Sequence, residues 1–527
     1  MRTTVLVASE LALYSCSLVS IGIPHRGTRP GPGRSLVSRT RGGMLFQGIL
    51  YVLVLLFSVI VLAKVRSRTL RQAVLLIASY ALYFTWGVWF AAVLVTSTVM
   101  NFLLGKWLKR KASGYVLSAG ILLNLVLLSS FKYLPEIAVN IPLPSLQRLS
   151  HLALPLGISF WTFQAMSYLF DLYRGEELDP SFFEFALYMV FFPVTISGPI
   201  CRIPDMLPQF RSVSAIRWDD IGQGLSRVAT GVFMMLIAQV LGQGILAGDG
   251  INGAFDRVTR WSGPDVWCLA FGYGLQLFFD FAGYSHIAIG AAQMLGFTLP
   301  ENFDRPFQST SPSIFWTRWH MSLSFWIRDY VFLLLVVLRR DAWWRNLTLV
   351  ISMVLFGLWH KASVLFLLWG CYHGAVLVLQ RQVVQFQRKF NCTQPGALWT
   401  PLAWVTTITI ISLGWIFFRA NSLSQVRQML SAILSPASYF SHFVSVSLYF
   451  LVIALAAGYG IVLLVREVLH RYSGESEVSP APSGIIALIA RWRWYWIPPL
   501  YALALLFLLI VTRTQGTNAA QFMYRSF

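Results

Sequence analysis

Long apolar runs alternate with short polar segments along most of this chain. Most runs approach the roughly 20 residues that an α-helix needs to cross a bilayer. Because the runs are continuous and do not alternate every second residue, they predict helices rather than the strands of a membrane barrel. We therefore expect an all-α, polytopic transmembrane bundle with roughly 10–13 membrane segments, some of them re-entrant or interfacial. The runs lie at 47–63, 72–104 (two crossings), 114–131, 226–248, 265–294, 402–418, 446–465 and 496–512.

The polar segments between these runs are mostly basic. They cluster at 64–71, 105–111, 339–345 and 381–389, and the whole chain has a formal net charge of +20. An excess of Lys and Arg in short loops marks the cytoplasmic side, so we expect these four segments there. The same scattering argues against a nucleic-acid partner, which would require one basic face. Charged residues make up 12% of the chain, against about 25% in soluble domains, which makes the lipid bilayer the principal partner.

Three regions outside the apolar runs shape the domain organisation. Residues 1–43 hold six arginines and one acidic residue, and they fit neither a signal peptide nor a transit peptide well. We expect 1–43 to be an N-terminal extension, disordered or derived from an upstream start codon, and 44–527 to form the functional domain. The mixed segments 201–225 and 466–495 are interpreted as cytoplasmic loops or surface helices. The five cysteines show no paired spacing, so we expect no metal site and no disulfide framework.

Ionisable residues inside apolar segments are energetically costly and therefore mark candidate functional sites. Asp280 and Gln276 lie four residues apart in the segment 271–290, so they share a helix face. Asp280 is interpreted either as part of a polar chamber or as a hydrogen-bonded residue that fixes helix packing. His286 lies about 240° further round an ideal helix and is expected to face elsewhere.

The segment 312–330 interleaves charged and aromatic side chains, among them Arg318, Trp319 and His320. Aromatic residues beside arginines are typical of membrane interfaces, so most of this segment is explained as an interfacial anchor. An anchor does not require a histidine. His320 therefore stays open as a functional residue, because histidine titrates near neutral pH.

The segment 346–380 is apolar between two basic flanks, which predicts a helical hairpin with both ends at the cytoplasm. His360 lies near its midpoint, between Trp359 and Lys361, so we expect it close to the hairpin vertex. Lys361 is too costly to face lipid and should meet water or an acidic partner. His373 is a weaker candidate, because Gly370 and Gly374 beside it favour simple close helix packing. We interpret His360 as the principal candidate for the chemistry.

Several blocks of the sequence, in this order, resemble the membrane-bound O-acyltransferase family, in particular its bacterial branch of alginate O-acetylation and teichoic-acid D-alanylation proteins. The resemblance covers residues 44–527. The matching blocks are LPLGISFWTFQAMSYLFDLYRG at 154–175, FFPVTISGPICR at 191–202, LFFDFAGYSHIAIG at 277–290, the stretch 295–330, FGLWHKASVLFLLWGCYHG at 356–374 and LGWIFFRA at 413–420.

The resemblance implies that His360 is the catalytic histidine and that His320 is the second polar position of the reaction chamber. Two positions depart from the family pattern. Lys361 stands where a glycine usually follows the catalytic histidine, and His286 stands where the family often has Asp. A neighbouring cation favours the neutral, proton-accepting form of a histidine; alternatively, the Lys361 side chain fills the chamber. The residues Asp280, Arg318, Trp319, Trp359, Lys361 and His373 are the expected chamber residues.

The reaction that this predicts is acyl transfer, most simply of an acetyl group, from a cytoplasmic thioester donor to hydroxyls of an extracytoplasmic polysaccharide. His360 would act as the base, and His320 or Arg318 would stabilise the oxyanion. No tightly bound cofactor is expected, and the donor would be acetyl-CoA or a carrier-protein thioester. The family resemblance also implies a bacterial inner-membrane location and an extracytoplasmic partner acyltransferase. Two alternatives remain at this point: a membrane transporter or flippase, and a catalytically silent partner in an acylation complex.

Overall fold

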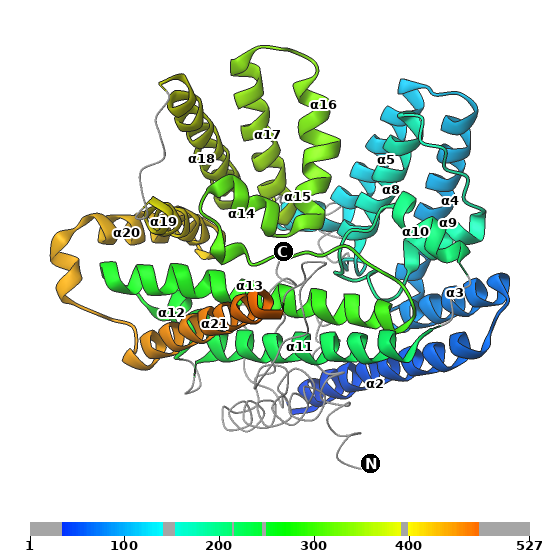
Figure 1. Cartoon of the computed structure of the whole chain (residues 1–527), viewed down its shortest axis with the longest axis horizontal. Coiled ribbons are helices and arrows are strands. Elements are labelled where there is room, and N and C mark those ends of the chain that lie inside the picture. Colours follow the sequence, from blue (N-terminus) through cyan, green and yellow to red (C-terminus); the bar gives the residue numbers. More distant parts are fainter. Residues whose placement is uncertain (1–33, 141–152, 213–215, 245–248, 391–398, 474–527) are drawn as a thin grey trace. The chain divides into compact units, whose positions relative to one another are not determined.

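Helices make up the regular structure of the protein (Figure 1). The computed structural model describes residues 34–140, 153–212, 216–244, 249–390 and 399–473. Within these ranges every regular element is a helix, and an isolated backbone bridge joins Phe303 to Trp319.

The chain divides into two compact units, and each is described by itself. Unit 1 takes in the described residues up to 232 and those from 284 to 408, and unit 2 takes in 233–283 and 409–473. Unit 1 contains α2 (Arg34–Lys64), α3 (Arg68–Phe84), α4 (Val88–Arg110), α5 (Gly114–Lys132), α6 (Leu134–Asn140), α8 (Ile158–Tyr173), α9 (Phe182–Val190), α10 (Ile203–Arg211), η2 (Pro306–Gln308), α14 (Pro312–Arg318), α15 (Met321–Ile327), η3 (Arg328–Phe332), α16 (Leu333–Val336), α17 (Ala342–His360) and α18 (Val364–Lys389). Unit 2 contains α12 (Ile251–Arg257), α20 (Leu423–Leu434), η4 (Pro436–Phe440) and α21 (Val446–Ser473). The helices α11 (Trp218–Gln243), α13 (Gly263–Met294) and α19 (Trp399–Arg419) contribute residues to both units.

Nine helices in the described part of the chain are long and apolar enough to cross a membrane: α2, α4, α5, α11, α13, α17, α18, α19 and α21. This confirms the all-α, polytopic fold that the apolar runs predict. The run 72–104 forms two helices, α3 and α4, which turn at Thr85–Gly87. Gly87 takes φ 143° there, a conformation that residues with a side chain rarely adopt. The expected membrane segment at 496–512 lies outside the described residues.

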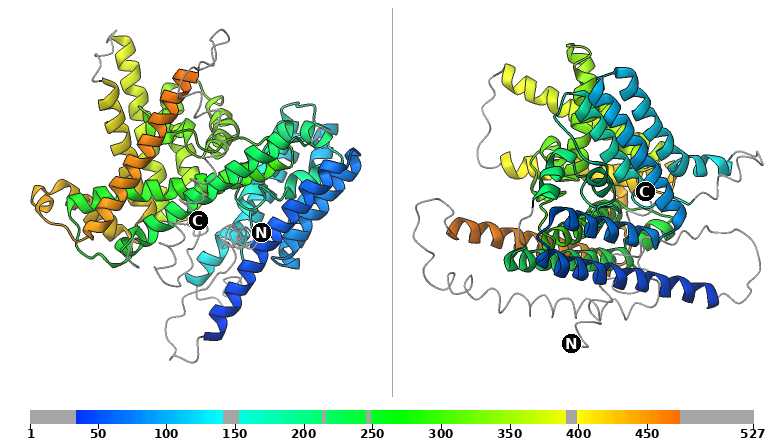
Figure 2. Two further views of the ribbon diagram at one scale, coloured as in Figure 1. Left: turned by 60° about the horizontal axis from the view of Figure 1, so that its bottom comes forward. Right: turned by 90° about the vertical axis from the view of Figure 1, so that its right-hand side faces the viewer.

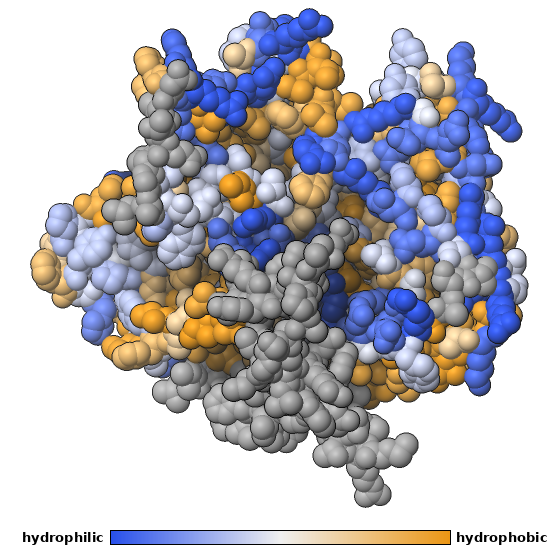
Figure 3. Space-filling model, viewed as in Figure 1, coloured by the Kyte–Doolittle hydropathy of each residue, from blue (hydrophilic) through white to orange (hydrophobic). Residues whose placement is uncertain are grey.

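The surfaces of these helices match a hydrocarbon solvent. In the most apolar 18-residue stretch of α21 only 11% of the residues are buried, and Phe450 in this helix is 70% exposed. In α2, Phe57 is 60% exposed. Figure 3 shows such apolar side chains gathered in continuous patches on the face in view. Patches of this size on a water-soluble monomer would promote association, whereas lipid tails cover them without penalty.

The helix ends add detail to three regions outside the apolar runs. Helix α2 begins at Arg34 and takes in residues 34–43; that 1–43 is an N-terminal extension stays a prediction. The segment 201–225 holds α10 and the first turns of α11, so it is partly helical. In the segment 466–495, residues 466–473 continue α21, and the remainder lies outside the described residues.

The first basic segment, 64–71, is bound firmly to the rest of unit 1. The Glu184 side chain of α9 is 2% exposed and pairs with Arg68 and, at 3.0 Å, with Arg211 of α10. Burial alone would raise the pKa of Glu184, but hydrogen bonds from the two arginines and the Ser181 backbone lower that pKa to about 2. Arg71, also buried, donates to the Leu62 carbonyl at 2.8 Å. These charges fix α3, α9 and α10 to one another.

Candidate active site

The hairpin predicted around His360 is formed by α17 and α18, which lie side by side (Figures 1 and 2). Residues 361–363 join them, and Ser363 caps α18 by accepting from the Phe366 backbone N–H at 3.5 Å. His360 is the last residue of α17, which confirms its place at the vertex. The arms are 19 and 26 residues long, so the hairpin extends beyond the limits 346–380 at both ends. The depth of the vertex in the bilayer stays a prediction.

Glycines allow the two arms to approach closely. A Cβ at Gly370 would lie 2.5 Å from the Cα of Val354, and one at Gly374 would lie 2.7 Å from the Cα of Val350. Side chains cannot occupy these positions while the backbones keep this separation. The close packing that Gly370 and Gly374 predict is therefore confirmed.

Gly370→Ala is expected to destabilise the protein by about 1–3 kcal/mol, the usual effect of overpacking, because backbone rather than a flexible side chain lies in the way. The thermal unfolding temperature of the detergent-solubilised chain measures this. Gly458→Ala is the matched control, since no described atom outside the backbone of its own helix, α21, lies within 4 Å of a Cβ at Gly458. Equal unfolding temperatures for wild type and Gly370→Ala would contradict the prediction.

His320 sits on a left-handed turn between α14 and α15. Its φ and ψ are 44° and 53°, one of two non-glycine residues with positive φ in the described ranges. Histidine is among the residues that tolerate this region, and such conformations concentrate at functional sites. The turn is held because the Met321 N–H donates to the Asn302 carbonyl at 2.9 Å and the Ser322 hydroxyl donates to Oδ1 of Asn302 at 2.6 Å. Burial lowers the pKa of His320 to about 3, so the imidazole is neutral.

The structure brings His320 and His360 to the same two aromatic rings. The Phe356 ring centroid lies 5.6 Å from that of His360 and 6.3 Å from that of His320. The Trp359 centroid lies 4.7 Å from His360 and 6.2 Å from His320. Both histidines are almost fully buried, at 5% and 1% exposure. Two imidazoles and an aromatic wall thus form one site, from segments that are separate in the sequence.

His373, on α18, lies near the same group of aromatic rings and shares the Trp369 ring with His360. Trp369 is 6.1 Å from the His360 ring and 4.8 Å from the His373 ring, while Trp316 is 5.1 Å from His373. His373 is 1% exposed, and neither of its ring nitrogens has a hydrogen-bond partner among the described residues. A buried polar atom without a hydrogen-bond partner is energetically costly. The ring nitrogens of His373 could therefore bind a ligand, although the ring also contributes to helix packing.

A cation and a phenol at the C-terminal end of α5 contact the hairpin vertex, and no pattern in the sequence indicates these contacts. Lys132, at the end of α5, donates to the Trp359 carbonyl, and its Nζ lies 4.7 Å from the Trp359 ring centroid. The Tyr133 hydroxyl donates to the Leu358 carbonyl at 3.1 Å. These two side chains satisfy carbonyls at the C-terminus of α17, where intrahelical donors are missing. They tie the turn that carries His360 to α5.

Trp359 is held on its other face by α8 and α15. Phe163 stacks on Trp359 at 5.5 Å and on Trp326 at 4.2 Å, and the Trp326 indole donates to the Phe163 carbonyl at 3.1 Å. Phe160 meets Trp359 edge-on at 6.1 Å. In the sequence, the segment that contains Phe160 and Phe163 is distinguished only by its family resemblance. Its packing role comes from tertiary contacts that no local pattern encodes.

The remaining predicted residues occupy different places. Trp319 is buried and stacks on Phe315 at 5.3 Å, and Arg318 is half-buried, its carbonyl accepting from the Asp304 N–H at 3.0 Å. Lys361 is half-buried and caps the C-terminus of α17. Asp280 is buried in the part of α13 that belongs to unit 2, and its role in the chamber stays a prediction.

The end of the segment 312–330 is more than an interfacial anchor. Asp329 pairs with Arg202 at 2.7 Å and with Arg328 at 2.6 Å, and the buried Tyr330 hydroxyl donates to Asp171 at 2.7 Å. These contacts link η3 to α8 and to the start of α10. In the described ranges, no three His, Cys, Asp or Glu side chains gather in a way that would hold a metal ion.

The comparisons with known proteins agree with this architecture. The family model of the membrane-bound O-acyltransferase family matches residues 46–420. The probable alginate O-acetylase of Pseudomonas aeruginosa is 32% identical over 408 residues, covering 74% of this chain and 75% of its own length. The peptidoglycan O-acetyltransferase of Helicobacter pylori is 32% identical over 394 residues, covering 68% of this chain and 72% of its own. The teichoic acid D-alanyltransferase of Bacillus subtilis is 30% identical over 281 residues, covering 50% of this chain and 68% of its own length.

A helical membrane bundle with two buried histidines beside one aromatic wall is thus matched by acyl-transfer proteins over most of its length. The chain belongs to the membrane-bound O-acyltransferase family. It is an O-acyltransferase and a multi-pass protein of the bacterial inner membrane. The transporter alternative is thereby set aside.

Proposed function

We propose that the protein transfers an acetyl group from a cytoplasmic thioester, acetyl-CoA or a carrier-protein thioester, to hydroxyls of an extracytoplasmic polysaccharide. The observation that supports this best is the pairing of His360 and His320 about Phe356 and Trp359. The acetylases among the relatives support acetyl as the group, and their names concern two different glycans, alginate and peptidoglycan.

His360 is the general base of this reaction. A hydroxyl is a weak nucleophile near neutral pH, and a positioned base adds roughly 10²–10⁴-fold. An unprotonated His360 nitrogen takes the hydroxyl proton as the oxygen attacks the thioester carbonyl. The N–H of the neutral His320 stabilises the resulting oxyanion. Collapse forms the ester and expels the thiolate, which recovers the proton from His360.

The route to the polysaccharide has two forms, which one experiment separates. In the direct form, the polysaccharide hydroxyl is the acceptor at His360. In the relayed form, the acetyl group passes first to an extracytoplasmic partner acyltransferase. The purified chain is placed in proteoliposomes with a labelled donor on one side and polysaccharide on the other. Labelled polymer without other proteins supports direct transfer, and labelling only with a periplasmic extract supports the relay. Absence of transfer in both arms contradicts the proposed function and favours the silent assembly partner.

Lys132 and Tyr133 position His360 in this proposal, since they bind the carbonyls of the turn that carries it. Lys132→Met keeps the length of the side chain but removes the charge and the donor. We expect kcat to fall about tenfold, the effect of one lost charge-assisted hydrogen bond, with little change in KM. The comparison variant is Lys361→Gly, which restores the glycine typical of the family beside His360 and removes the other nearby cation. A larger loss in Lys361→Gly than in Lys132→Met would contradict this assignment and make Lys361 the functional cation.

A further inference from the structure

The turn that carries His320 is shaped by the segment that precedes η2. Residues 302–304 lie antiparallel to 318–321 through an isolated backbone bridge. In a regular antiparallel ladder His320 would be the residue opposite Asn302. Here the Asn302 carbonyl accepts from the Met321 N–H at 2.9 Å, one residue further on. His320, with φ 44°, therefore takes the place of the extra residue in a β-bulge, a device that re-aims a side chain beside an active site.

The side chain of Asn302 supports this turn from inside the protein. Its Oδ1 accepts from the Ser322 hydroxyl at 2.6 Å, and its Nδ2 donates to the Ser285 hydroxyl at 3.0 Å. The Ser322 hydroxyl in turn accepts from the Ile200 N–H at 3.0 Å. The three side chains are buried, so water competes little for these bonds.

The hydrogen bonds of this network have one consistent direction. Because the Ser322 oxygen accepts from a backbone N–H, its own proton is available to Asn302, and the atom that it meets there must be the amide oxygen. The amide nitrogen is left to donate to Ser285. Asparagine suits the position because it offers an acceptor and a donor without a charge, and a charge without a partner would be costly at a buried site.

Three segments of unit 1 that are distant in the sequence meet at the start of α15. Ile200 lies between α9 and α10, Ser285 belongs to α13, and Asn302 follows that helix. The network ends at Ser322, two residues after His320. A change in the network therefore displaces the backbone from which the imidazole extends.

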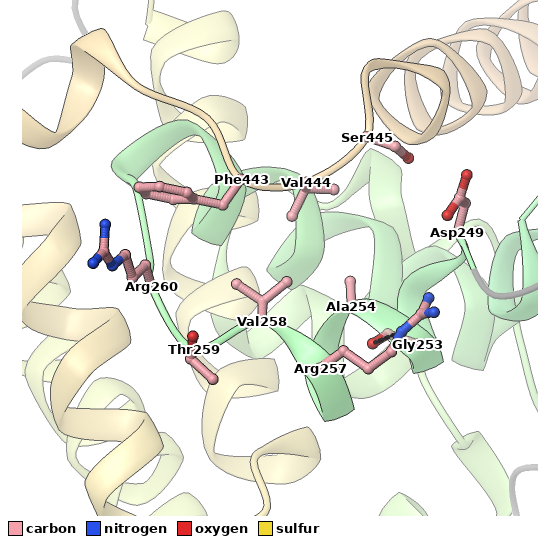
Figure 4. Close-up of a pocket in the computed structure, with 10 residues that line it drawn as sticks. All are labelled: Asp249, Gly253, Ala254, Arg257, Val258, Thr259, Arg260, Phe443, Val444 and Ser445. Atoms are coloured by element: carbon pink, nitrogen blue, oxygen red, sulfur yellow. Dashed lines mark hydrogen bonds between the residues drawn. The ribbon is translucent and has the colours of Figure 1, made fainter.

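The cavity of unit 2 shown in Figure 4 is less specific. It measures about 360 Å³, and its charged lining residues are Asp249, Arg257 and Arg260. Two arginines and one aspartate suit many small anions equally, so this lining does not identify a ligand. The hydrogen bonds of Asn302, in contrast, act on one defined side chain, that of His320.

We infer that Asn302 is a positioning residue for His320. Together with Ser322 and Ser285, it holds the imidazole N–H where the oxyanion develops. This inference rests on the proposed function, which makes His320 the oxyanion donor. Such donors act only when they are aimed at the oxyanion, and a displacement of about 1 Å can lower a rate on the order of a hundredfold.

The first test is a double-mutant cycle, measured as acetyl transfer in proteoliposomes. Asn302→Ala should lower kcat about tenfold and change KM less than about twofold, because the donor is displaced but remains present. In a His320→Gly background the same replacement should lower kcat by less than about twofold, since no imidazole remains to be positioned. Equal factors in the two backgrounds would show that Asn302 only stabilises the fold, and the inference would fall.

Asn101→Ala is the matched control for the loss of a buried amide. Asn101 is buried in α4 and donates to the Ser97 carbonyl at 2.9 Å and to Oδ1 of Asn124 at 3.1 Å. Its replacement should lower the unfolding temperature, as Asn302→Ala does, while kcat stays within about twofold of wild type. A tenfold loss of kcat in Asn101→Ala would reduce the effect at Asn302 to general destabilisation.

Ser285→Ala is the milder variant, used if Asn302→Ala does not accumulate in the membrane. It removes only the acceptor of the Asn302 amide and leaves the backbone pairing of the turn intact. We expect kcat to fall about threefold, the effect of one neutral hydrogen bond, and again only where His320 is present. An equal loss in the His320→Gly background would contradict the inference.

The environment of the His320 ring can also be measured without acetyl transfer. The full chain, with its eight histidines isotope-labelled, is placed in nanodiscs, and the ring signal of His320 is assigned by its absence from the NMR spectrum of His320→Gly. Asn302→Ala should shift or broaden this signal, and Asn101→Ala should leave it in place. An unchanged signal in Asn302→Ala contradicts this inference even where transfer proceeds. A shifted signal in a chain that transfers no acetyl group contradicts only the proposed function.

Discussion

Replacing His360 by alanine is expected to lower acetyl transfer by about 10²–10⁴-fold, the contribution of a positioned general base. The ring lies at the end of α17 with Phe356 stacked on it and Trp359 edge-on beside it. Labelled acetyl groups in the polymer, measured at saturating donor, report the change. The amount of protein in the membrane fraction must be unchanged.

His373→Ala is the matched control for this loss, because it removes a second buried histidine from the same hairpin. The two variants leave similar cavities against Trp369, which contacts both rings. A general cavity effect would therefore lower both activities equally. We expect His373→Ala to retain most of the activity, and added imidazole to restore part of the activity of His360→Ala only. Unchanged transfer in His360→Ala would remove His360 from the mechanism.

The sequence predicts the hairpin and its histidine because both depend on short-range patterns. Apolar runs between basic flanks specify two helices that begin and end on one side, and an ionisable group at the midpoint of the run is rare enough to stand out. Gly370 and Gly374 are also recognisable from the local sequence, since two glycines four residues apart on a helix indicate a close helix contact. The structure confirms these features with changes only at the helix ends, where flanking residues such as Ala342 and Lys389 continue the helices.

The rest of the site depends on contacts between distant segments. Lys132 meets a carbonyl 227 positions later in the chain, and at the end of an apolar run it has the same local pattern as any lysine at a membrane surface. The same is true of Arg68, whose partner Glu184 is 116 positions away. Charge patterns assign such residues to a side of the membrane, but they do not reveal which carboxylate or carbonyl they bind.

Replacing His320 by glycine is expected to lower acetyl transfer by about 10²–10³-fold, the effect of removing one oxyanion donor. Glycine is the informative replacement because His320 has φ 44°. Alanine would add strain of roughly 1–2 kcal/mol in this conformation, whereas glycine adopts it freely. A loss of activity in His320→Gly, with an unchanged unfolding temperature, therefore reports the imidazole rather than the turn.

The pH dependence gives a second, independent readout for His320. Because burial lowers the pKa of His320 to about 3, its ring stays a neutral donor throughout the working range. The activity of His320→Gly should thus fall by the same factor at every pH from about 5 to 8, a range well above that pKa, without a change in the shape of the profile. His320→Asn, which also tolerates a left-handed turn and keeps an N–H donor, should recover part of the rate. Full activity in His320→Gly would show that this position serves the backbone turn alone, and a single histidine would then carry the reaction.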